Sequence, residues 1–312
     1  MPVQIGSVPS ESWAEVLQLV FRNLPPDVGR RQIDAMLEQF AAEPESASGL
    51  VDARLGDALV AAILIQLQPG RVASLFPPQA AGDAIVGEGN HVLVQSGLTL
   101  SRLLTAATEL AVRANTRMIQ ALLPTDSGSD AQRLLAAGFE HVADLLYLVS
   151  PASSFPSTCP DDVLQYEPFS PAAAERFAAT VERTYVGTRD CPRLNGVRPI
   201  GDVLEGYRAV GRFDPENWRL VRHNEDDVGC LLLADHLPHR LWELVYMGIV
   251  PEARGKGFGL AVARRAQWLA GQAGAERLVL AVDAANEPAI NGYAAAGFAG
   301  WDRRSVFLKL LS

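Results

Sequence analysis

The sequence predicts two mixed α/β domains that arose by tandem duplication. Its 312 residues exceed the size of one typical domain, and an apolar fraction of 48% is enough for two hydrophobic cores. The segment at 133–149 resembles the segment at 292–310: each reads as a helix that runs into Gly-Phe and then a last strand. Aligning Phe139 with Phe298 gives an offset of 159 residues. A tandem repeat explains this better than chance similarity of a short alanine-rich motif.

The first half shows alternating helical and strand-like hydrophobic patterns. Expected helices carry apolar residues three and four positions apart, and expected strands are short apolar runs. In chain order they are helix 11–24, helix 29–42, strand 58–67, helix 99–114, strand 118–123 and strand 145–149. The Pro- and Ser-rich segment 151–162 is expected to be the linker. The domains would therefore cover 1–155 and 160–312.

The second half repeats this alternation with a longer central strand. The expected order is strand 163–168, helix 172–185, strands 218–222, 228–234 and 241–250, helix 260–273, strand 277–283, helix 287–296 and strand 305–310. The run 241–250 is apolar almost throughout and ends at Pro251, which is typical of a strand buried on both faces. The segment 184–207 has no clear periodicity, and long irregular loops tend to be functional.

Charge and cysteine content exclude several classes of protein. The chain has 36 acidic and 27 basic residues, and its net charge of −9 disfavours nucleic acid as a partner. Its three cysteines form no CxxC pair and no metal-site spacing, which predicts no metal and a reducing compartment. A leader pattern is not evident and no apolar run is long enough to cross a bilayer, so we expect a cytoplasmic protein without membrane contact.

A Gly-rich loop follows the long strand and precedes a helix. Its sequence is Arg254-Gly255-Lys256-Gly257-Phe258-Gly259. Glycines permit positive φ and let a ligand approach the backbone, while the first N–H groups of the helix lack intrahelical partners and attract anions. The pattern predicts a pyrophosphate cradle. The NTPase phosphate loop is excluded because Gly257, not Ser or Thr, follows Lys256, and the dinucleotide fingerprint is excluded because its last glycine is missing.

The motif that fits is Arg-x-x-Gly-x-Gly, formed by Arg254, Gly257 and Gly259. With these residues the chain resembles the GNAT acetyltransferase superfamily, whose signature loop has this spacing. Asn286 and the Tyr-x-x-x-Gly-Phe block from Tyr293 stand at the distance expected from that family. The resemblance covers about 162–312 and implies, for each half, a mixed, mostly antiparallel sheet flanked by helices.

This resemblance also implies roles for individual residues. Acetyl-CoA would be the cosubstrate, held by backbone groups, by one positive side chain and by one side-chain amide. The residues expected to bind it are Met247, Ile249, Arg254, Gly255, Gly257, Gly259, Leu260 and Asn286. Arg264 and Arg265 either meet the nucleotide phosphates or form an exposed helical face.

Two residues are expected to move protons. Tyr293 would protonate the departing thiolate, a role that suits a phenol of pKa near 10 beside a thiol of pKa near 8.5. Glu243, a charged residue in an apolar strand, would be the general base if it lies on the face of Met247; the alternative is the solvated end of the strand beside Arg240. A water chain is a further alternative for the base.

Three polar residues of the loops are not expected to have a catalytic or metal-binding role. Cys191 has no nearby histidine to activate it and is expected to be inert, and His236 and His239 are expected to form a polar turn rather than a metal site.

At the same offset of 159, the first half replaces the motif by bulky residues. Its counterparts are Gln95, Leu98, Leu100 and Leu134, although Gly87, Gly89 and Gly97 lie near enough for an insertion to shift the alignment. We expect a degenerate GNAT-like domain, a layout similar to that of the mycothiol synthases.

The predicted function is therefore transfer of an acetyl group to a primary amine of a small molecule or peptide. The alternative is a catalytically silent acyl-CoA-binding regulatory protein.

Overall fold

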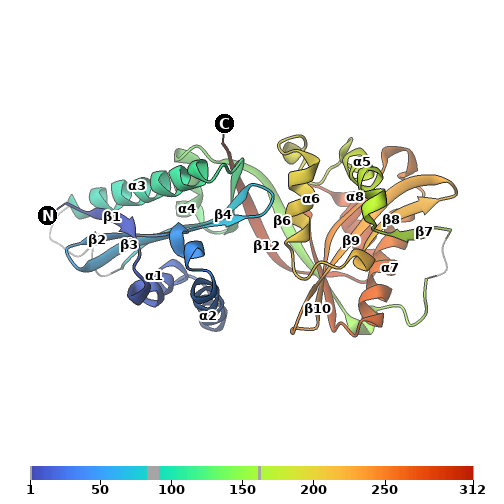
Figure 1. Cartoon of the computed structure of the whole chain (residues 1–312), viewed down its shortest axis with the longest axis horizontal. Coiled ribbons are helices and arrows are strands. Elements are labelled where there is room, and N and C mark those ends of the chain that lie inside the picture. The colour runs from blue at the N-terminus through green and yellow to red at the C-terminus, as the bar shows by residue number, and fades with distance from the viewer. Residues whose placement is uncertain (1, 83–90, 161–162, 312) are drawn as a thin grey trace. The chain divides into compact units, whose positions relative to one another are not determined.

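The computed structural model describes residues 2–82, 91–160 and 163–311, and it divides into two compact units (Figure 1). Unit 1 comprises Met1–His141 with Val306–Ser312, and unit 2 comprises Val142–Ser305. These limits differ from the predicted domains 1–155 and 160–312. Unit 2 contains most of Glu140–Pro151 (β6), which is the last strand of the first half. Unit 1 contains the end of Ala299–Leu310 (β12), which is the last strand of the second half. The predicted linker, 151–162, lies inside the sequence of unit 2.

Unit 1 has a sheet with helices on both faces. Its elements are β1 Gln4–Ser7, α1 Trp13–Val20, α2 Pro26–Ala42, β2 Leu50–Leu55, β3 Ala58–Gln68, β4 Val72–Ala80, α3 His91–Arg113, β5 Met118–Pro124, α4 Gly128–Ala136 and the end of β12, Ala299–Leu310. The strand order is β1-β2-β3-β4-β5-β12. One core lies between the sheet and α3, and another lies under α1 and α2 on the opposite face (Figure 1).

Unit 2 repeats this arrangement. Its elements are β6 Glu140–Pro151, β7 Gln165–Pro168, α5 Ala174–Tyr185, α6 Ile200–Arg208, β8 Trp218–His223, β9 Asp226–His236, β10 Leu241–Ile249, α7 Phe258–Gln272, β11 Arg277–Asp283, α8 Glu287–Ala295 and the start of β12. The strand order is β12-β6-β11-β10-β9-β8-β7. The core with α7 and α8 covers one face, and the core with α5 and α6 covers the other.

The two units share details that support duplication. In each unit, one of the described strand pairs is parallel over three residues: Val72–Ser74 with Met118–Gln120 in unit 1, and Leu241–Glu243 with Arg277–Val279 in unit 2. The pairs β1–β2, β2–β3 and β3–β4 of unit 1 and β7–β8, β8–β9 and β9–β10 of unit 2 are antiparallel. The helix before each last strand also ends alike. Phe139 N–H donates to Leu134 O and Phe298 N–H to Tyr293 O, both at 3.0 Å, after glycines with φ of 83° and 88°.

The predicted strands and helices are present with shifts at their ends, and the tandem mixed fold is confirmed. Four elements were missed. Three are the short or irregular strands β1, β2 and β4, and the fourth is α6, which occupies part of the segment that was predicted to be irregular. Within the described residues, no helix is long and apolar enough to cross a membrane.

The exchange of last strands predicts that the C-terminal residues stabilise unit 1. Phe307 is 4% exposed and belongs to the core under α3. Phe307→Ala is expected to lower the free energy of unfolding by about 3–5 kcal/mol, because it removes a buried ring and leaves a cavity. Leu310→Ala is the control, since Leu310 is 59% exposed. Urea denaturation measures both, and equal small effects would contradict the placement of β12.

Candidate active site

The site of unit 2 begins where two parallel strands separate. β10 and β11 pair over only three residues, from Leu241–Arg277 to Glu243–Val279. Beyond this point residues 244–249 of β10 and Ala281 and Val282 of β11 line a cavity of about 470 Å³. Backbone N–H and C=O groups at a gap between strands lack ladder partners, so they are available to a ligand. The gap therefore provides an extended polar edge inside a largely apolar cavity.

A β-bulge determines which side chains of β10 face which helices. Leu244 pairs with Leu233 and Tyr246 with Leu232, so Val245 is the extra residue. After the bulge, Met247 and Ile249 pack with the core of α7 and α8, whereas Tyr246 packs with the core of α5 and α6. Glu243 therefore does not share the face of Met247, so the condition under which the sequence made it the general base is not met.

The Gly-rich loop leads from β10 into α7 as predicted. Gly255 and Gly257 have φ of 76° and 81°, and Gly257 is the residue that precedes the first turn of α7. A Cβ at Gly255, Gly257 or Gly259 would meet no protein atom within 4 Å, so the space in front of the loop is not filled by the protein. Open space before the free N–H groups of a helix N-terminus is suited to a pyrophosphate. This geometry fits the CoA moiety that the motif implies.

Arg254 holds the Gly-rich loop through hydrogen bonds to three backbone carbonyls. Its Nε donates to Ile249 O at 3.0 Å, and its Nη1 and Nη2 donate to Gly187 O at 3.1 Å and Thr184 O at 2.8 Å. The guanidinium thus joins the end of β10, the end of α5 and the loop after α5. These three hydrogen bonds position the loop and leave two of the five N–H donors of the guanidinium, so contact with a phosphate stays a prediction.

This assignment is tested by exchanging Arg254 for lysine. Arg254→Lys keeps the charge but cannot reach three carbonyls with a planar group, so we expect it to resemble Arg254→Ala. Both should lower the free energy of unfolding by about 1–3 kcal/mol and weaken CoA binding. Thermal unfolding and calorimetric titration with CoA measure these effects. Retained CoA affinity in the lysine variant alone would show that the charge matters instead.

The cavity brings together nearly all the residues predicted for the site. Those that line it are Met247, Ile249, Arg254, Gly255, Gly257, Gly259, Leu260, Asn286 and Tyr293. Asn286 also caps α8, since its Oδ1 accepts from Ala289 N–H at 3.4 Å. The same cavity is also lined by Thr184, Gly187, Thr188, Arg189 and Asp190, so the start of the segment 184–207 borders the site.

Tyr293 is buried in the wall of this cavity, where its side chain is 6% exposed. Its ring packs edge-on against Phe298, with centroids 5.6 Å apart. Within the described part of the chain, its hydroxyl makes no hydrogen bond. Burial raises the pKa of the phenol well above its ordinary value, and the nearby Asp190 carboxylate raises it further. The phenol therefore stays protonated at neutral pH, and its role as a proton donor stays a prediction.

Glu243 is not brought together with Tyr293. It is absent from the cavity lining, and its carboxylate meets the His236 ring at 2.9 Å between Oε2 and Nε2. The hydrogen bond with Glu243 raises the pKa of His236. The two residues stand on adjacent strands, β10 and β9, at the end where the parallel pair is intact.

The loop after α5 is also hydrogen-bonded to the end of β11. Asp190 Oδ1 accepts from Asp283 N–H at 2.8 Å, and Cys191 N–H donates to Asp283 Oδ2 at 3.0 Å. Asp283 Oδ1 accepts from Ala285 N–H at 2.9 Å. Burial raises the pKa of the Cys191 thiol to about 12, which agrees with the expected inert cysteine. The loop 184–191 is thus fixed to both strands that border the gap.

The remaining charged candidates of the second half lie away from the cavity lining. The Arg265 guanidinium lies over the rings of Tyr166, at 4.9 Å, and Trp268, at 4.6 Å, and Arg264 is exposed. Among the described residues, no group of three or more His, Cys, Asp or Glu is arranged to hold a metal ion.

The corresponding loop of unit 1 precedes α3, and residues 83–90 of it, with Gly87 and Gly89, lie outside the described residues. Gln95, Leu98 and Leu100 stand within α3, whose start at His91 comes 167 residues before that of α7 at Phe258. The two helices nevertheless end 159 residues apart, at Arg113 and Gln272, so the offset of 159 holds along them and α3 is longer at its start. The offset also holds at Leu134, which is fully buried and takes the place of Tyr293.

Comparison with known proteins agrees with this geometry. Residues 189–298 match the model of the Acetyltransferase (GNAT) family. A mycothiol acetyltransferase of Streptomyces bingchenggensis is 36% identical over 100 residues, which are 32% of this chain and 32% of that protein. The match thus spans about a third of the relative's length.

Two solved structures resemble nearly the whole chain. A GCN5-related N-acetyltransferase from Sphaerobacter thermophilus has a TM-score of 0.65 at 17% identity, over 99% of this chain and 95% of that one. A tandem GNAT protein from the clavulanic acid biosynthesis pathway has a TM-score of 0.52 at 13% identity, over 99% and 98%. These findings confirm the predicted resemblance to the GNAT family and the tandem GNAT fold.

The cradle is tested by a pair of glycines with similar backbone conformation. Gly257→Val places a branched side chain in the open space before α7 and adds strain of about 1–2 kcal/mol at positive φ. CoA binding is expected to weaken by about tenfold or more. Gly274→Val is the matched control, because Gly274 has φ of 76° and open space outside the cavity. Equal CoA affinities of the two variants, measured by calorimetry, would show that the cradle lies elsewhere.

Proposed function

We propose that the chain is an N-acetyltransferase that transfers the acetyl group of acetyl-CoA to a primary amine of a small molecule or peptide. The observation that carries this proposal is one cavity that joins the Gly-rich loop, the open edge of β10 and the buried Tyr293 phenol. Helix α7 and its loop would hold the pyrophosphate, and Asn286 would bind the pantetheine arm. The match to mycothiol acetyltransferases supports a small-molecule acceptor.

The residues of β10 would serve the acetyl group itself. Met247 and Ile249 line the cavity, and their backbone groups would bind pantetheine and polarise the thioester carbonyl. As the amine attacks, negative charge grows on that oxygen, and preorganised N–H donors stabilise it most in a cavity that excludes water. Unit 1, with Leu134 in place of Tyr293, would have a supporting role and no chemistry of its own.

Thiol release from acetyl-CoA across a panel of primary amines tests the proposal. An enzyme should exceed the rate of hydrolysis with at least one amine. A flat response from a chain that still binds CoA would favour the alternative, a silent acyl-CoA-binding regulatory protein. Calorimetry of the whole chain should in either case give one CoA per chain.

Tyr293→Phe separates binding from chemistry. The substitution keeps the ring packed against Phe298 and removes only the proton donor, so CoA affinity should stay within about twofold. Turnover should fall by ~10²–10⁴-fold if the phenol protonates the leaving thiolate. Steady-state rates with acetyl-CoA, together with calorimetry, measure both quantities. Wild-type turnover at a pH where chemistry limits the rate would mean that water supplies the proton.

A further inference from the structure

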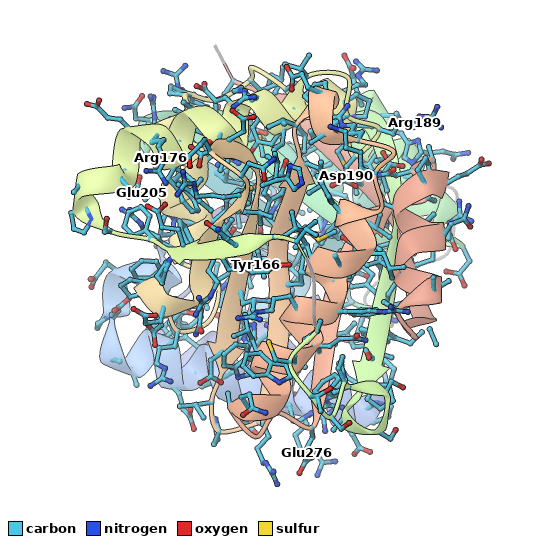
Figure 2. The ribbon with its side chains drawn as sticks, turned by 90° about the vertical axis from the view of Figure 1, so that its right-hand side faces the viewer. Tyr166, Arg176, Arg189, Asp190, Glu205 and Glu276 are labelled. Atoms are coloured by element: carbon cyan, nitrogen blue, oxygen red, sulfur yellow. The ribbon has the colours of Figure 1, made fainter. Side chains whose placement is uncertain are left out.

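The end of the cavity beside Tyr293 carries a carboxylate that the sequence did not reveal. Asp190 is half-buried in the cavity wall, in the loop after α5. Figure 2 shows Asp190 and Arg189 near α8, at the end of the sheet opposite Glu276, which precedes β11. Since Asp190 bonds to the end of β11 and Tyr293 belongs to α8, the two side chains come from different elements and meet at the same cavity.

The carboxylate of Asp190 lacks an ion-pair partner in the part of the chain that the structure describes. Among the described residues, no basic side chain forms an ion pair with it, and its Oδ1 accepts from the backbone N–H of Asp283. A half-buried carboxylate without a counter-ion is costly, and a cationic ligand would relieve that cost. The Tyr293 phenol lies in the wall of the same cavity, close enough for the charge of Asp190 to raise its pKa.

Building on the proposed acetyl transfer, we propose that the Asp190 carboxylate receives the ammonium group of the acceptor and removes its proton, beside the Tyr293 phenol. The acceptor class is therefore a cationic primary amine. Glu243, the base predicted from the sequence, is paired with His236 and lies outside the cavity lining.

The proton balance is closed by these two side chains and water. Asp190 takes the first ammonium proton and releases it to solvent, and the nitrogen lone pair forms the bond to the thioester carbonyl carbon. Asp190 then takes the second proton from the nitrogen as the C–S bond breaks. The sulfur leaves with the electron pair of that bond and receives the phenol proton of Tyr293. Water carries the proton of Asp190 back to Tyr293, and the products are an amide and CoA thiol.

The surroundings of Asp190 favour this role. Burial raises the pKa of its carboxyl, the backbone N–H of Asp283 lowers it and the charge of Asp283 raises it again, with a net rise. A carboxylate with a raised pKa is a stronger base than one in water. The titratable and charged groups near it, on its own loop and on β10, β11 and α8, are Arg189, Cys191, Tyr246, Asp283 and Tyr293.

The decisive variant is Asp190→Asn, which keeps an oxygen for the Asp283 N–H and removes the base. We expect kcat/KM for the amine to fall by ~10²–10⁴-fold while CoA affinity stays within about twofold. The part of the pH–rate profile set by Asp190 should vanish, leaving only the ionisation of the amine. Glu252→Gln is the matched control, since Glu252 has a 72% exposed side chain and lies outside the cavity lining.

Thermal stability gives a readout that needs no acceptor. Because the folded pKa is raised, the charged form of Asp190 destabilises the fold above that pKa and has no such effect below the unfolded value of about 3.9. Asp190→Asn should therefore raise the Tm by about 2–4 °C at pH 7.5 and lose this gain near pH 3.5. A lower Tm at pH 7.5 with lost CoA binding would make Asp190 a structural residue and overturn the proposal.

The remaining outcomes separate this inference from the proposed function. If the wild type acetylates an amine and Asp190→Asn retains its rate within about threefold, Asp190 is not the base; a large loss in Glu243→Gln would then assign the base to Glu243. If the wild type acetylates none, acetyl transfer fails, and NMR titration of the CoA-loaded protein with propylammonium decides the ammonium site. Weaker binding by Asp190→Asn than by wild type would support that site, and equal binding would reject it.

Discussion

The active-site geometry depends on the separation of β10 from β11 after three residue pairs. Parallel strands that continue to pair would satisfy their own backbone groups and leave nothing for a ligand. The bulge at Val245 follows directly after the last paired residues, and β10 then continues into the Gly-rich loop. The loop after α5 then spans the gap, and Arg254 and Asp283 fix its two ends. The Gly-rich loop, the open edge of β10 and the loop after α5 thus all border the same interruption of regular strand pairing.

The sequence predicted those features that depend on local pattern. A long apolar run ending at Pro251 identified the central strand, and the glycine spacing identified the loop whose φ values are indeed positive at Gly255 and Gly257. The last helix was found because Gly297 and Phe298 form a compact C-terminal motif. Each of these signals arises from residues within one turn or one strand, where hydrophobic period and backbone preference act directly.

The features that escaped prediction depend on residues far apart in the chain. The bulge in β10 is a property of its pairing with β9, so the face of Glu243 could not be derived from alternation alone. Arg254 donates to carbonyls of Thr184 and Gly187, which follow from the packing of α5 and not from the loop motif. Asp190 meets Asp283 across 93 positions. A motif names the residue types at a site, whereas the fold decides which polar groups remain free.

Comparison of unit 1 with unit 2 shows which features of the fold do not depend on the residues of the candidate site. It keeps the short parallel pair and the helix end that precedes Phe139, so neither feature requires a tyrosine. Leu134, at the position of Tyr293, is fully buried and joins the core. In unit 2 this position carries a phenol that lines the cavity, and Asp190 adds a carboxylate without an ion-pair partner among the described residues. Both groups line the same cavity, where the proposed cationic amine would balance the charge of Asp190 and the departing sulfur of CoA would take the proton of Tyr293.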